Sequence, residues 1–222
     1  MSSTSPRWIA GPLTHAALSI AAELFAGKPR KNGDTPYLSH LLAVSALVME
    51  HGGSEVQAAA GLLHDTIEDI KIPASELIAM LVTYGASPAD ARAVGVIVQD
   101  TTDGQPEERR NRRDWPQRKA TYLHSLHGKG PHDPALLVSL ADKVHNSEAT
   151  LQIIRAGTTA TTFYGKPWFN AEAPAQMWYY SSLAQVFREK LGGNALTLPL
   201  VRRLESAVNE IFVGVEAKAP SL

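Results

Sequence analysis

The chain has 222 residues, of which 44% are apolar and 19% are charged, a composition typical of globular proteins. Its 21 basic and 22 acidic residues give a formal net charge of -1, so there is no overall field to attract a nucleic acid polymer or an anionic membrane. Cysteine is absent, which excludes disulfides, thiolate nucleophiles and cysteine-ligated zinc. Any metal chemistry must therefore come from histidines and carboxylates.

The N-terminus, MSSTSPRWIAGPLTH, lacks the basic start and continuous apolar stretch of a signal peptide. No apolar run approaches the length of a membrane span. We therefore expect a soluble, cytoplasmic protein without a membrane partner. The length, together with the lack of internal repeats and linkers, predicts one domain over residues 1–222.

Helix signals recur in chain order: Ser, Thr or Asp caps, proline in a first turn and glycine after a last turn. They predict an all-α fold. Thr14 is expected to open the first helix and Gly27 to close it. The β-branched run 96–98 is assigned to a helix because its flanks are rich in alanine. The remaining helices are predicted over about 36–52, 55–68, 74–84, 88–100, 115–127, 134–155, 174–191 and 199–213, with loops at 102–114 and 156–173.

The densest group of polar residues follows an apolar run and spans His64–Asp69. On a continuous α-helix His64 would lie one turn before Glu68, and Asp65 one turn before Asp69. The four side chains would then form two adjacent stacks on one side of the helix. The first pair could ligate a cation while the second reaches a water or a leaving oxygen. The alternative is a histidine with solvated acids at a helix end, and the segment alone favours neither.

Two further polar residues accompany apolar runs. His40 lies near the start of the second helix, where a lone histidine is more often a cap or a satisfied core residue. Asp142 follows the apolar run 136–141, and a carboxylate reaching the interior needs a cation or several donors. With His64 and Asp65 they form a set of two imidazoles and two carboxylates. Such a set suits manganese, iron, cobalt or zinc better than calcium or magnesium.

The order of these motifs resembles the HD superfamily, whose signature is an isolated histidine, a His-Asp pair and a distant aspartate. The extended form His-Asp-x-x-Glu-Asp at 64–69 is similar to the RelA/SpoT hydrolase branch. Segments 27–31, 35–40, 59–69 and 140–146 follow the family's order, so the resemblance covers roughly residues 14–155. It implies an HD-domain helical bundle over that core, with additional C-terminal helices at roughly 170–215.

In this branch the HD domain removes the 3′-pyrophosphate of the alarmones ppGpp and pppGpp with manganese. The resemblance therefore implies a stand-alone, metal-dependent pyrophosphohydrolase similar to the small alarmone hydrolases, which gives GDP or GTP and pyrophosphate. Its expected cofactor is Mn²⁺, with another divalent transition metal as the alternative. Its expected partner is a nucleotide, guanine or adenine, and a homo-oligomer is compatible with this expectation.

The resemblance also assigns roles to residues. The implied metal ligands are His40, His64, Asp65 and Asp142. The implied catalytic pair, which activates the attacking water, is Glu68 and Asp69. The implied substrate contacts are Arg30, Lys31, Lys143 and Asn146, and in second rank Arg118, Lys119 and Tyr122. The chemistry agrees, because arginine can bind phosphate as a fork and stack on a purine, and lysine supplies a point charge.

Four positions depart from the family's pattern. Many relatives have histidine at Phe25, glutamine at Lys28, proline at Leu41 and threonine at Ala149. None of these changes removes a ligand. Phe25, Lys28 and Ala149 are expected to line the base pocket, so the preference between guanine and adenine stays open.

Two further clusters carry alternative interpretations. An arginine-rich run either contacts the 5′-phosphates of an alarmone or, as is more common, is a solvated loop; it contains Arg109, Arg110, Arg112 and Arg113. An aromatic cluster is expected to pack the C-terminal helices on the core or on a partner subunit rather than to bind a ligand; it contains Phe163, Tyr164, Trp168, Phe169, Trp178, Tyr179 and Tyr180.

Two other functions remain open. The same site could act on NADPH, a dNTP or a nucleoside monophosphate, as other HD proteins do. Alternatively, the chain is a non-catalytic nucleotide-binding regulatory module. The Glu-Asp pair favours the alarmone branch, and retention of the whole ligand set and both acids disfavours the regulatory module.

Overall fold

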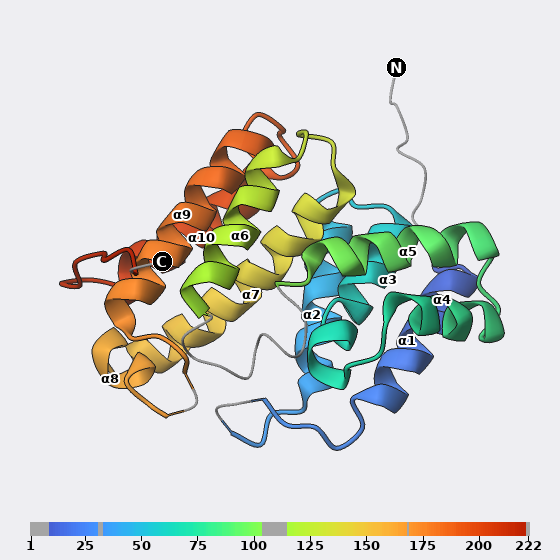
Figure 1. The fold of residues 1–222 in the computed structure, drawn as a ribbon, viewed down its shortest axis with the longest axis horizontal. Helices are drawn as coiled ribbons and strands as arrows, with labels where there is room; N and C mark the ends of the chain where they lie inside the picture. Colours follow the sequence, from blue (N-terminus) through green and yellow to red (C-terminus); the bar gives the residue numbers. More distant parts are fainter. Residues whose placement is uncertain (1–8, 31–32, 104–114, 168, 221–222) are drawn as a thin grey trace.

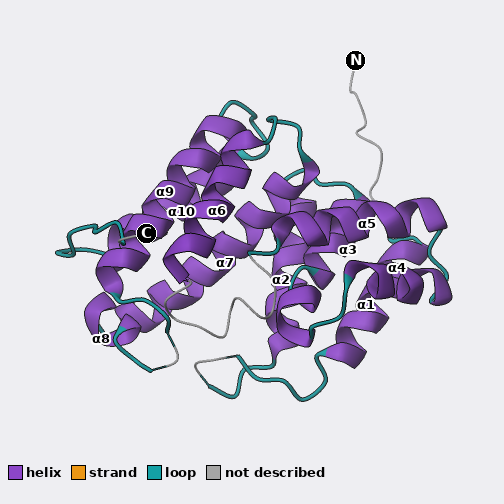
Figure 2. Ribbon diagram, in the orientation of Figure 1, coloured by secondary structure: helices purple, strands orange, loops and turns teal. Residues whose placement is uncertain are grey.

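The computed structural model describes residues 9–30, 33–103, 115–167 and 169–220. Within these ranges the fold is all-α, as predicted (Figure 2), and the extended pairing is an isolated bridge between Pro29 and Pro36. The helices are α1 (Pro12–Leu24), α2 (Tyr37–Glu50), α3 (Glu55–Leu63), the π-helical turn η1 (Thr66–Ile70), α4 (Ala74–Thr83), α5 (Pro88–Thr101), α6 (Trp115–Gly128), α7 (Pro134–Arg155), α8 (Ala160–Tyr164), α9 (Ala173–Leu191) and α10 (Leu198–Ile211).

Helix α7 is the central element of the fold. It packs against α2, α3 and α5 on one side and against α9 and α10 on the other (Figure 1). Its turns are lined by fully buried apolar side chains such as Leu136, Leu140 and Val144. Asp142 lies in the middle of this helix, so its carboxylate is held where the two groups of helices meet.

Helices α2 and α3 lie unusually close together because α3 carries small residues on its inner face. A Cβ atom at Gly61 would lie only 3.2 Å from the Cα of Ser45 in α2. Across the same contact, Ser45 Oγ donates a hydrogen bond of 2.9 Å to the carbonyl of Ala58. This close packing brings His40 of α2 beside His64, which caps the end of α3.

Most of the predicted helix starts are confirmed, but α1 starts differently. It begins at Pro12, with Gly11 as the capping residue, rather than at Thr14. Glu55 of α3 supplies the cap, since its Oε1 accepts from the backbone N–H groups of Gly11 at 2.8 Å and Thr14 at 3.1 Å. A cap donated by a distant helix leaves no local signal in the sequence.

The prediction of one helix over 55–68 is wrong. Helix α3 ends at Leu63 because two side chains compete for carbonyls of its last turn: His64 Nδ1 lies 2.9 Å from Gly61 O, and Thr66 Oγ1 donates to Leu63 O at 2.7 Å. The chain then forms the π-helical turn η1, which ends at Lys71 with a left-handed φ of 69°. The two side-chain stacks predicted on one continuous α-helix are therefore not formed, and Glu68 and Asp69 are positioned by η1 instead.

The segment 156–173, predicted to be a loop, contains the short helix α8. Its first turn is capped by Thr159, whose hydroxyl accepts from Thr162 N at 3.2 Å. Helix α8 packs on α9 and so belongs to the C-terminal group of helices. Of the helices in the described ranges, none combines the length and apolar character needed to cross a membrane.

Candidate functional site

The four residues expected to bind a metal come together at the contact of α2, α3 and α7. His40 Nε2 lies 3.5 Å from Asp65 Oδ2 and 3.3 Å from Asp142 Oδ1. His64 Nε2 lies 3.0 Å and 3.5 Å from the same two oxygens. The ligand atoms of His40, His64 and Asp65 all lie within 4.8 Å of one another. Residues more than a hundred positions apart thus form one compact group.

The hydrogen bonds of His64 show which of its nitrogens is available. Its Nδ1 faces the carbonyl of Gly61, which can only accept, so Nδ1 carries the hydrogen. Its Nε2 is buried and has no hydrogen-bond partner among the described residues. A lone pair facing two carboxylate oxygens is unfavourable unless a proton or a metal cation lies between them.

His40 is also held through its Nδ1, in this case by His145. The Arg30 guanidinium, which can only donate, lies 3.1 Å from His145 Nδ1, so this nitrogen accepts. His40 Nδ1 lies 2.8 Å from the same atom and must therefore carry its own hydrogen. Burial and the charges of His40 and Arg30 lower the pKa of His145 to about 4, which keeps its ring neutral. The lone pair of His40 Nε2 is left facing the carboxylates.

Both aspartates of the group are ionised. Burial raises the pKa of Asp65, but the charge of His64 beside it holds this pKa well below its usual range. Burial also raises the pKa of Asp142, and the charge of Lys143 reverses this effect. Tyr37 OH donates to Asp65 Oδ2 at 2.6 Å.

The group as a whole fits a divalent cation. Asp142 accepts from Asn146 Nδ2 at 2.6 Å and from Lys143 Nζ at 2.5 Å, so its carboxylate is fixed in place. Two outward-facing Nε2 lone pairs and two oriented carboxylates form a mixed nitrogen and oxygen donor set, which transition metals favour. Each imidazole is held through its other nitrogen, as metal-binding histidines usually are.

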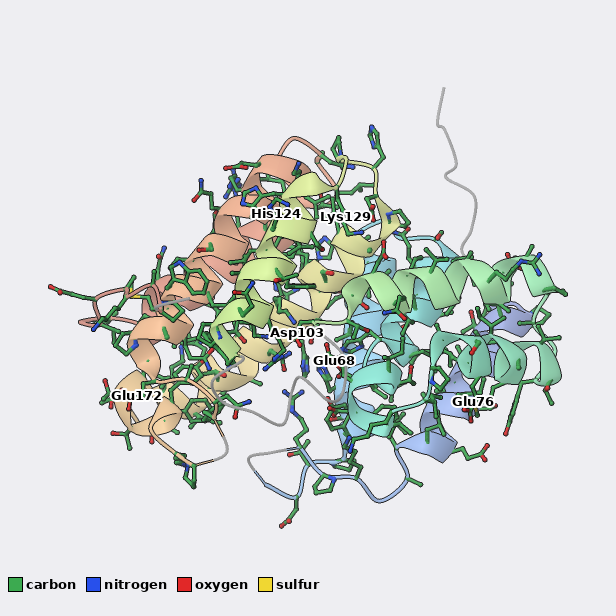
Figure 3. The ribbon with its side chains drawn as sticks, in the orientation of Figure 1. Glu68, Glu76, Asp103, His124, Lys129 and Glu172 are labelled. Atoms are coloured by element: carbon green, nitrogen blue, oxygen red, sulfur yellow. The ribbon has the colours of Figure 1, made fainter. Side chains whose placement is uncertain are left out.

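The two acids of η1 lie beside this group but have different partners. Glu68 Oε1 accepts a 2.6 Å hydrogen bond from the backbone N–H of Asp103, and the two residues are labelled close together at the centre of Figure 3. Asp69 Oδ2 pairs with Lys28 Nζ at 2.9 Å. Lys28 in turn lies 4.9 Å from the centre of the Tyr37 ring. The structure thus distinguishes two acids that the sequence pattern presents as a pair.

A cavity of about 600 Å³ opens from the group. It is lined by both acids of η1, by His64, Asp65 and Asp142, and by six of the expected substrate contacts, which are Arg30, Arg118, Lys119, Tyr122, Lys143 and Asn146. The seventh, Lys31, and the arginine-rich run 109–113 lie outside the described residues. Ala149 lines the cavity as expected. Phe25 instead stacks on Tyr37 at 5.1 Å, and neither Phe25 nor Lys28 is among the described residues that line it.

Basic residues also line the cavity. Arg118 NH1 donates to Asp103 Oδ1 at 3.1 Å, and Lys119 also pairs with Asp103. Arg118 is only 7% exposed, and its Nε has no hydrogen-bond partner within the described ranges. A buried guanidinium N–H beside a cavity is a donor available to an anionic ligand.

The aromatic cluster does more than the sequence analysis expects. Phe163, Tyr164 and Phe169 pack on one another, with ring centres 4.9 to 5.0 Å apart, and all three also line the cavity. Tyr179 lines it too, below Lys119 Nζ at 4.5 Å, and its buried hydroxyl has no hydrogen-bond partner in the described part of the chain. Trp168 lies outside the described residues. No sequence signal separates Tyr179 from its aromatic neighbours, because only the fold brings it to the cavity.

Comparison with known proteins agrees with this geometry. A family model described as "HD domain" matches residues 17–157. A probable guanosine-3′,5′-bis(diphosphate) 3′-pyrophosphohydrolase of Synechocystis is 30% identical over 132 residues, which are 59% of this chain and 16% of that protein. The guanosine-3′,5′-bis(diphosphate) 3′-pyrophosphohydrolase MESH1 of Xenopus tropicalis is 31% identical over 133 residues, which are 59% of this chain and 65% of that protein. The chain thus spans only a small part of the first of these relatives and about two thirds of the second.

Two solved structures share the fold. One is a metazoan orthologue of SpoT that hydrolyses ppGpp, with a TM-score of 0.66 and 20% identity, covering 92% of this chain and 97% of that one. The other is the protein lmo0812 of Listeria monocytogenes, with a TM-score of 0.62 and 22% identity, covering 80% of this chain and 98% of that one. At such low identity these structures support the fold alone. The family match spans most of the chain and includes all four clustered residues, and on this evidence the chain belongs to the HD domain family.

Proposed function

We propose that this protein is a manganese-dependent hydrolase that removes the 3′-pyrophosphate of (p)ppGpp, with (p)ppApp as a second substrate. The observation that carries the proposal is the convergence of His40, His64, Asp65 and Asp142 beside a cavity that Arg30, Arg118, Lys119 and Lys143 also line. The names of the Synechocystis and Xenopus relatives support this choice of substrate.

The four clustered residues would hold the cation. When bound, it would supply Lewis acidity that polarises a phosphoryl oxygen and makes water a better nucleophile at neutral pH. The protein contributes the orientation of the ligands, through Gly61 to His64 and through His145 to His40. Manganese is proposed because a mixed set of imidazoles and carboxylates suits a divalent transition metal.

Glu68 is proposed to accept the proton of the attacking water. Its Oε1 is held by the backbone of Asp103, and its carboxylate lines the cavity. Asp69 is proposed to orient the water rather than to transfer a proton, because its Oδ2 is already engaged by Lys28 Nζ at 2.9 Å. As the new bond from water to phosphorus forms, the bond from phosphorus to the ribose 3′-oxygen breaks, and that oxygen takes up a proton that balances the one Glu68 accepts from the water.

The basic residues of the cavity are proposed to hold the substrate's phosphates. Arg118 offers its Nε, which has no hydrogen-bond partner among the described residues. Lys119 and Lys143 add positive charge to the same cavity. Arg30 donates to Asn146 Oδ1 at 2.8 Å, so these two expected substrate contacts come to the cavity as one unit. Tyr179 would add a neutral hydroxyl donor for a phosphate or ribose oxygen.

The proposal is tested by incubating the manganese-loaded protein with ppGpp, ppApp, NADPH and dGTP in parallel. We expect pyrophosphate from the first two and no product from the others. Release of orthophosphate from NADPH alone would transfer the assignment to another HD activity. Tight binding of ppGpp without turnover would instead support a regulatory module.

A further inference from the structure

Asp103 is a buried residue of the cavity wall that belongs to none of the motifs from which the site was predicted. It follows Thr102, the capping residue at the end of α5, and is only 4% exposed. The hydroxyls of Thr101 and Thr102 both donate to the carbonyl of Val98, at 2.9 and 2.8 Å, which fixes the end of the helix. Asp103 lines the cavity together with Glu68. It is therefore held at a defined place beside the proposed reaction.

Every hydrogen-bonding group of Asp103 has a partner. Its backbone N–H donates to Glu68 Oε1 at 2.6 Å, and the two residues are labelled near each other in Figure 3. Its carbonyl oxygen and its Oδ1 both accept from Arg118 NH1, each at 3.1 Å. Its Oδ2 pairs with Lys119. One residue thus connects the proposed proton acceptor on η1 with two cations of α6.

The contacts of Arg118 with Asp103 close a small ring. Because NH1 meets both the carbonyl and the carboxylate of Asp103, the backbone and the side chain of that residue are held together. A guanidinium is planar, so the same contacts also fix the direction of the Arg118 Nε. This Nε is buried, has no hydrogen-bond partner in the described part of the chain and is proposed above to meet a substrate phosphate. The ring therefore fixes the position of that phosphate relative to Glu68.

The charges favour a positioning role for Asp103 over a role in substrate affinity. Its carboxylate offsets one of the two positive charges that Arg118 and Lys119 bring to the cavity. An acid at this place weakens the attraction of an anionic ligand. The hydrogen bond to Glu68 gives the acid a different purpose, since a reactive side chain is held in its productive geometry by the hydrogen bonds that support it.

We propose that Asp103 is a positioning residue, which directs the Glu68 carboxylate towards the attacking water and fixes it relative to Arg118. This inference rests on the proposed function in taking Glu68 as the proton acceptor. The action is indirect. The backbone N–H of Asp103 holds Glu68, and its side chain, paired with Arg118 and Lys119, holds that backbone in place. A purely structural role as counter-charge for buried cations predicts no link to Glu68.

The link is tested by hydrogen exchange on the manganese-loaded protein, which does not depend on turnover. Mass spectrometry of fragments that end on either side of position 103 gives the exchange rate of that amide. Glu68→Ala should raise this rate by about ten- to a hundredfold, the range for a hydrogen bond to a charged group. Asp103→Ala, after correction for the change in intrinsic exchange rate, should raise it by a similar factor while the amides of α7 keep their protection. Arg118→Met opens the same ring from the other side and should act likewise.

Kinetics with ppGpp separate positioning from phosphate binding. Asp103→Ala should lower kcat by about 10- to 100-fold, since a misplaced reactive group can cost this much. It should not raise KM, because it leaves Arg118 and Lys119 without their counter-charge. In the Glu68→Gln background the same substitution should have little further effect on kcat, since the group that it positions is already lost. Asp103→Asn keeps an oxygen for Arg118 NH1 and should recover most of kcat.

Asp100→Ala is the matched control. Asp100 lies three residues earlier on α5, and its carboxylate also pairs with a lysine, Lys129 Nζ at 2.6 Å. It is not among the described residues that line the cavity. The variant should leave both kcat and the exchange rate at position 103 unchanged.

The two proposals fail in different ways. Unchanged exchange at position 103 in both Asp103→Ala and Arg118→Met would overturn the inference. A fall in kcat caused by Asp103→Ala that persists in full in the Glu68→Gln background would also overturn it, because Asp103 would then act through another group. Faster exchange at position 103 in the variants of a protein that hydrolyses neither ppGpp nor ppApp would refute only the proposed function.

Discussion

Replacing His145 by leucine removes the acceptor that orients His40 and leaves the four proposed metal ligands unchanged. His145 Nδ1 accepts from His40 at 2.8 Å and from Arg30 at 3.1 Å. In His145→Leu, His40 loses its only oriented contact through Nδ1 in the described structure, whereas Arg30 keeps its 2.8 Å bond to Asn146. The loss should therefore fall on metal binding more than on substrate binding.

The expected loss of metal affinity can be taken from other metal sites in which a hydrogen-bond partner of a ligand has been removed. Removal of such a partner typically costs about 10- to 100-fold in metal affinity, or about 1.4–2.8 kcal/mol. We expect the dissociation constant for Mn²⁺ to rise by this factor and the KM for substrate at saturating Mn²⁺ to change by less. Competition with a fluorescent chelator measures the first quantity, and steady-state kinetics measure the second.

Two further variants make the result specific. His145→Gln retains a side-chain acceptor and should recover most of the Mn²⁺ affinity. His124→Leu changes an exposed histidine of α6 that Figure 3 labels far from Glu68 and Asp103, and should have no effect. Unchanged Mn²⁺ affinity in His145→Leu, or a defect in His145→Gln as large as that in leucine, would refute the argument that the hydrogen bond orients His40.

Three other predictions test the site and its support. Asp65→Ala should abolish Mn²⁺ binding and turnover together, whereas Glu68→Gln should leave Mn²⁺ bound and lower kcat by about 10²- to 10⁴-fold. Equal metal loss in both variants would contradict the assignment of Asp65 as a ligand and Glu68 as the proton acceptor. Because the carboxylates raise the pKa of buried His64 despite its desolvation, a proton competes with the cation, so Mn²⁺ affinity should fall as pH is lowered and binding should release protons. Calorimetry in buffers of different ionisation enthalpy measures that release, and its absence around neutral pH would contradict the assignment. Gly61→Ala should lower the free energy of unfolding by about 1–3 kcal/mol, because the added methyl group meets the α2 backbone at 3.2 Å. Urea denaturation measures this change. An unchanged midpoint would show that the α2–α3 contact is looser than described.

Lowering the pH should weaken Mn²⁺ binding but stabilise the fold of the metal-free chain, and both effects arise from His64. The pKa of His64 is higher in the folded chain than in the unfolded one. Its contribution to stability is therefore fully present below the unfolded value of about 6.5 and is lost as pH rises through the folded value. Metal binding replaces the proton and should restore that stability at the higher pH.

Much of the helical framework could be predicted from the sequence, because helix starts depend on short-range signals. Ser54 with Gln57, and Asp133 at the start of α7, form local caps of the kind expected at the predicted helix starts. The clustered set of His40, His64, Asp65 and Asp142 was identified from motif order, since these polar residues accompany apolar runs that must be buried. Their meeting in one group is a consequence of the helix packing that those runs require.

Other features depended on contacts between distant segments. Glu55 caps α1 across the α1–α3 contact, and α3 stops at Leu63 because side chains compete for its last carbonyls. The sequence pattern alone also could not show that Lys28 pairs with Asp69 or that Glu68 meets the backbone of Asp103. These contacts give different partners to two acids that are adjacent in the chain.

The contrast is clearest in the C-terminal aromatic residues. From sequence they were expected to serve packing, and they do pack, but Tyr164, Phe169 and Tyr180 also line the cavity. Local sequence signals determined that this chain is helical, and the order of its motifs indicated which residues form the proposed metal site. Only the tertiary structure decided which buried rings face a cavity, because that depends on how α8 and α9 pack against α7, and no local interaction along the chain specifies it.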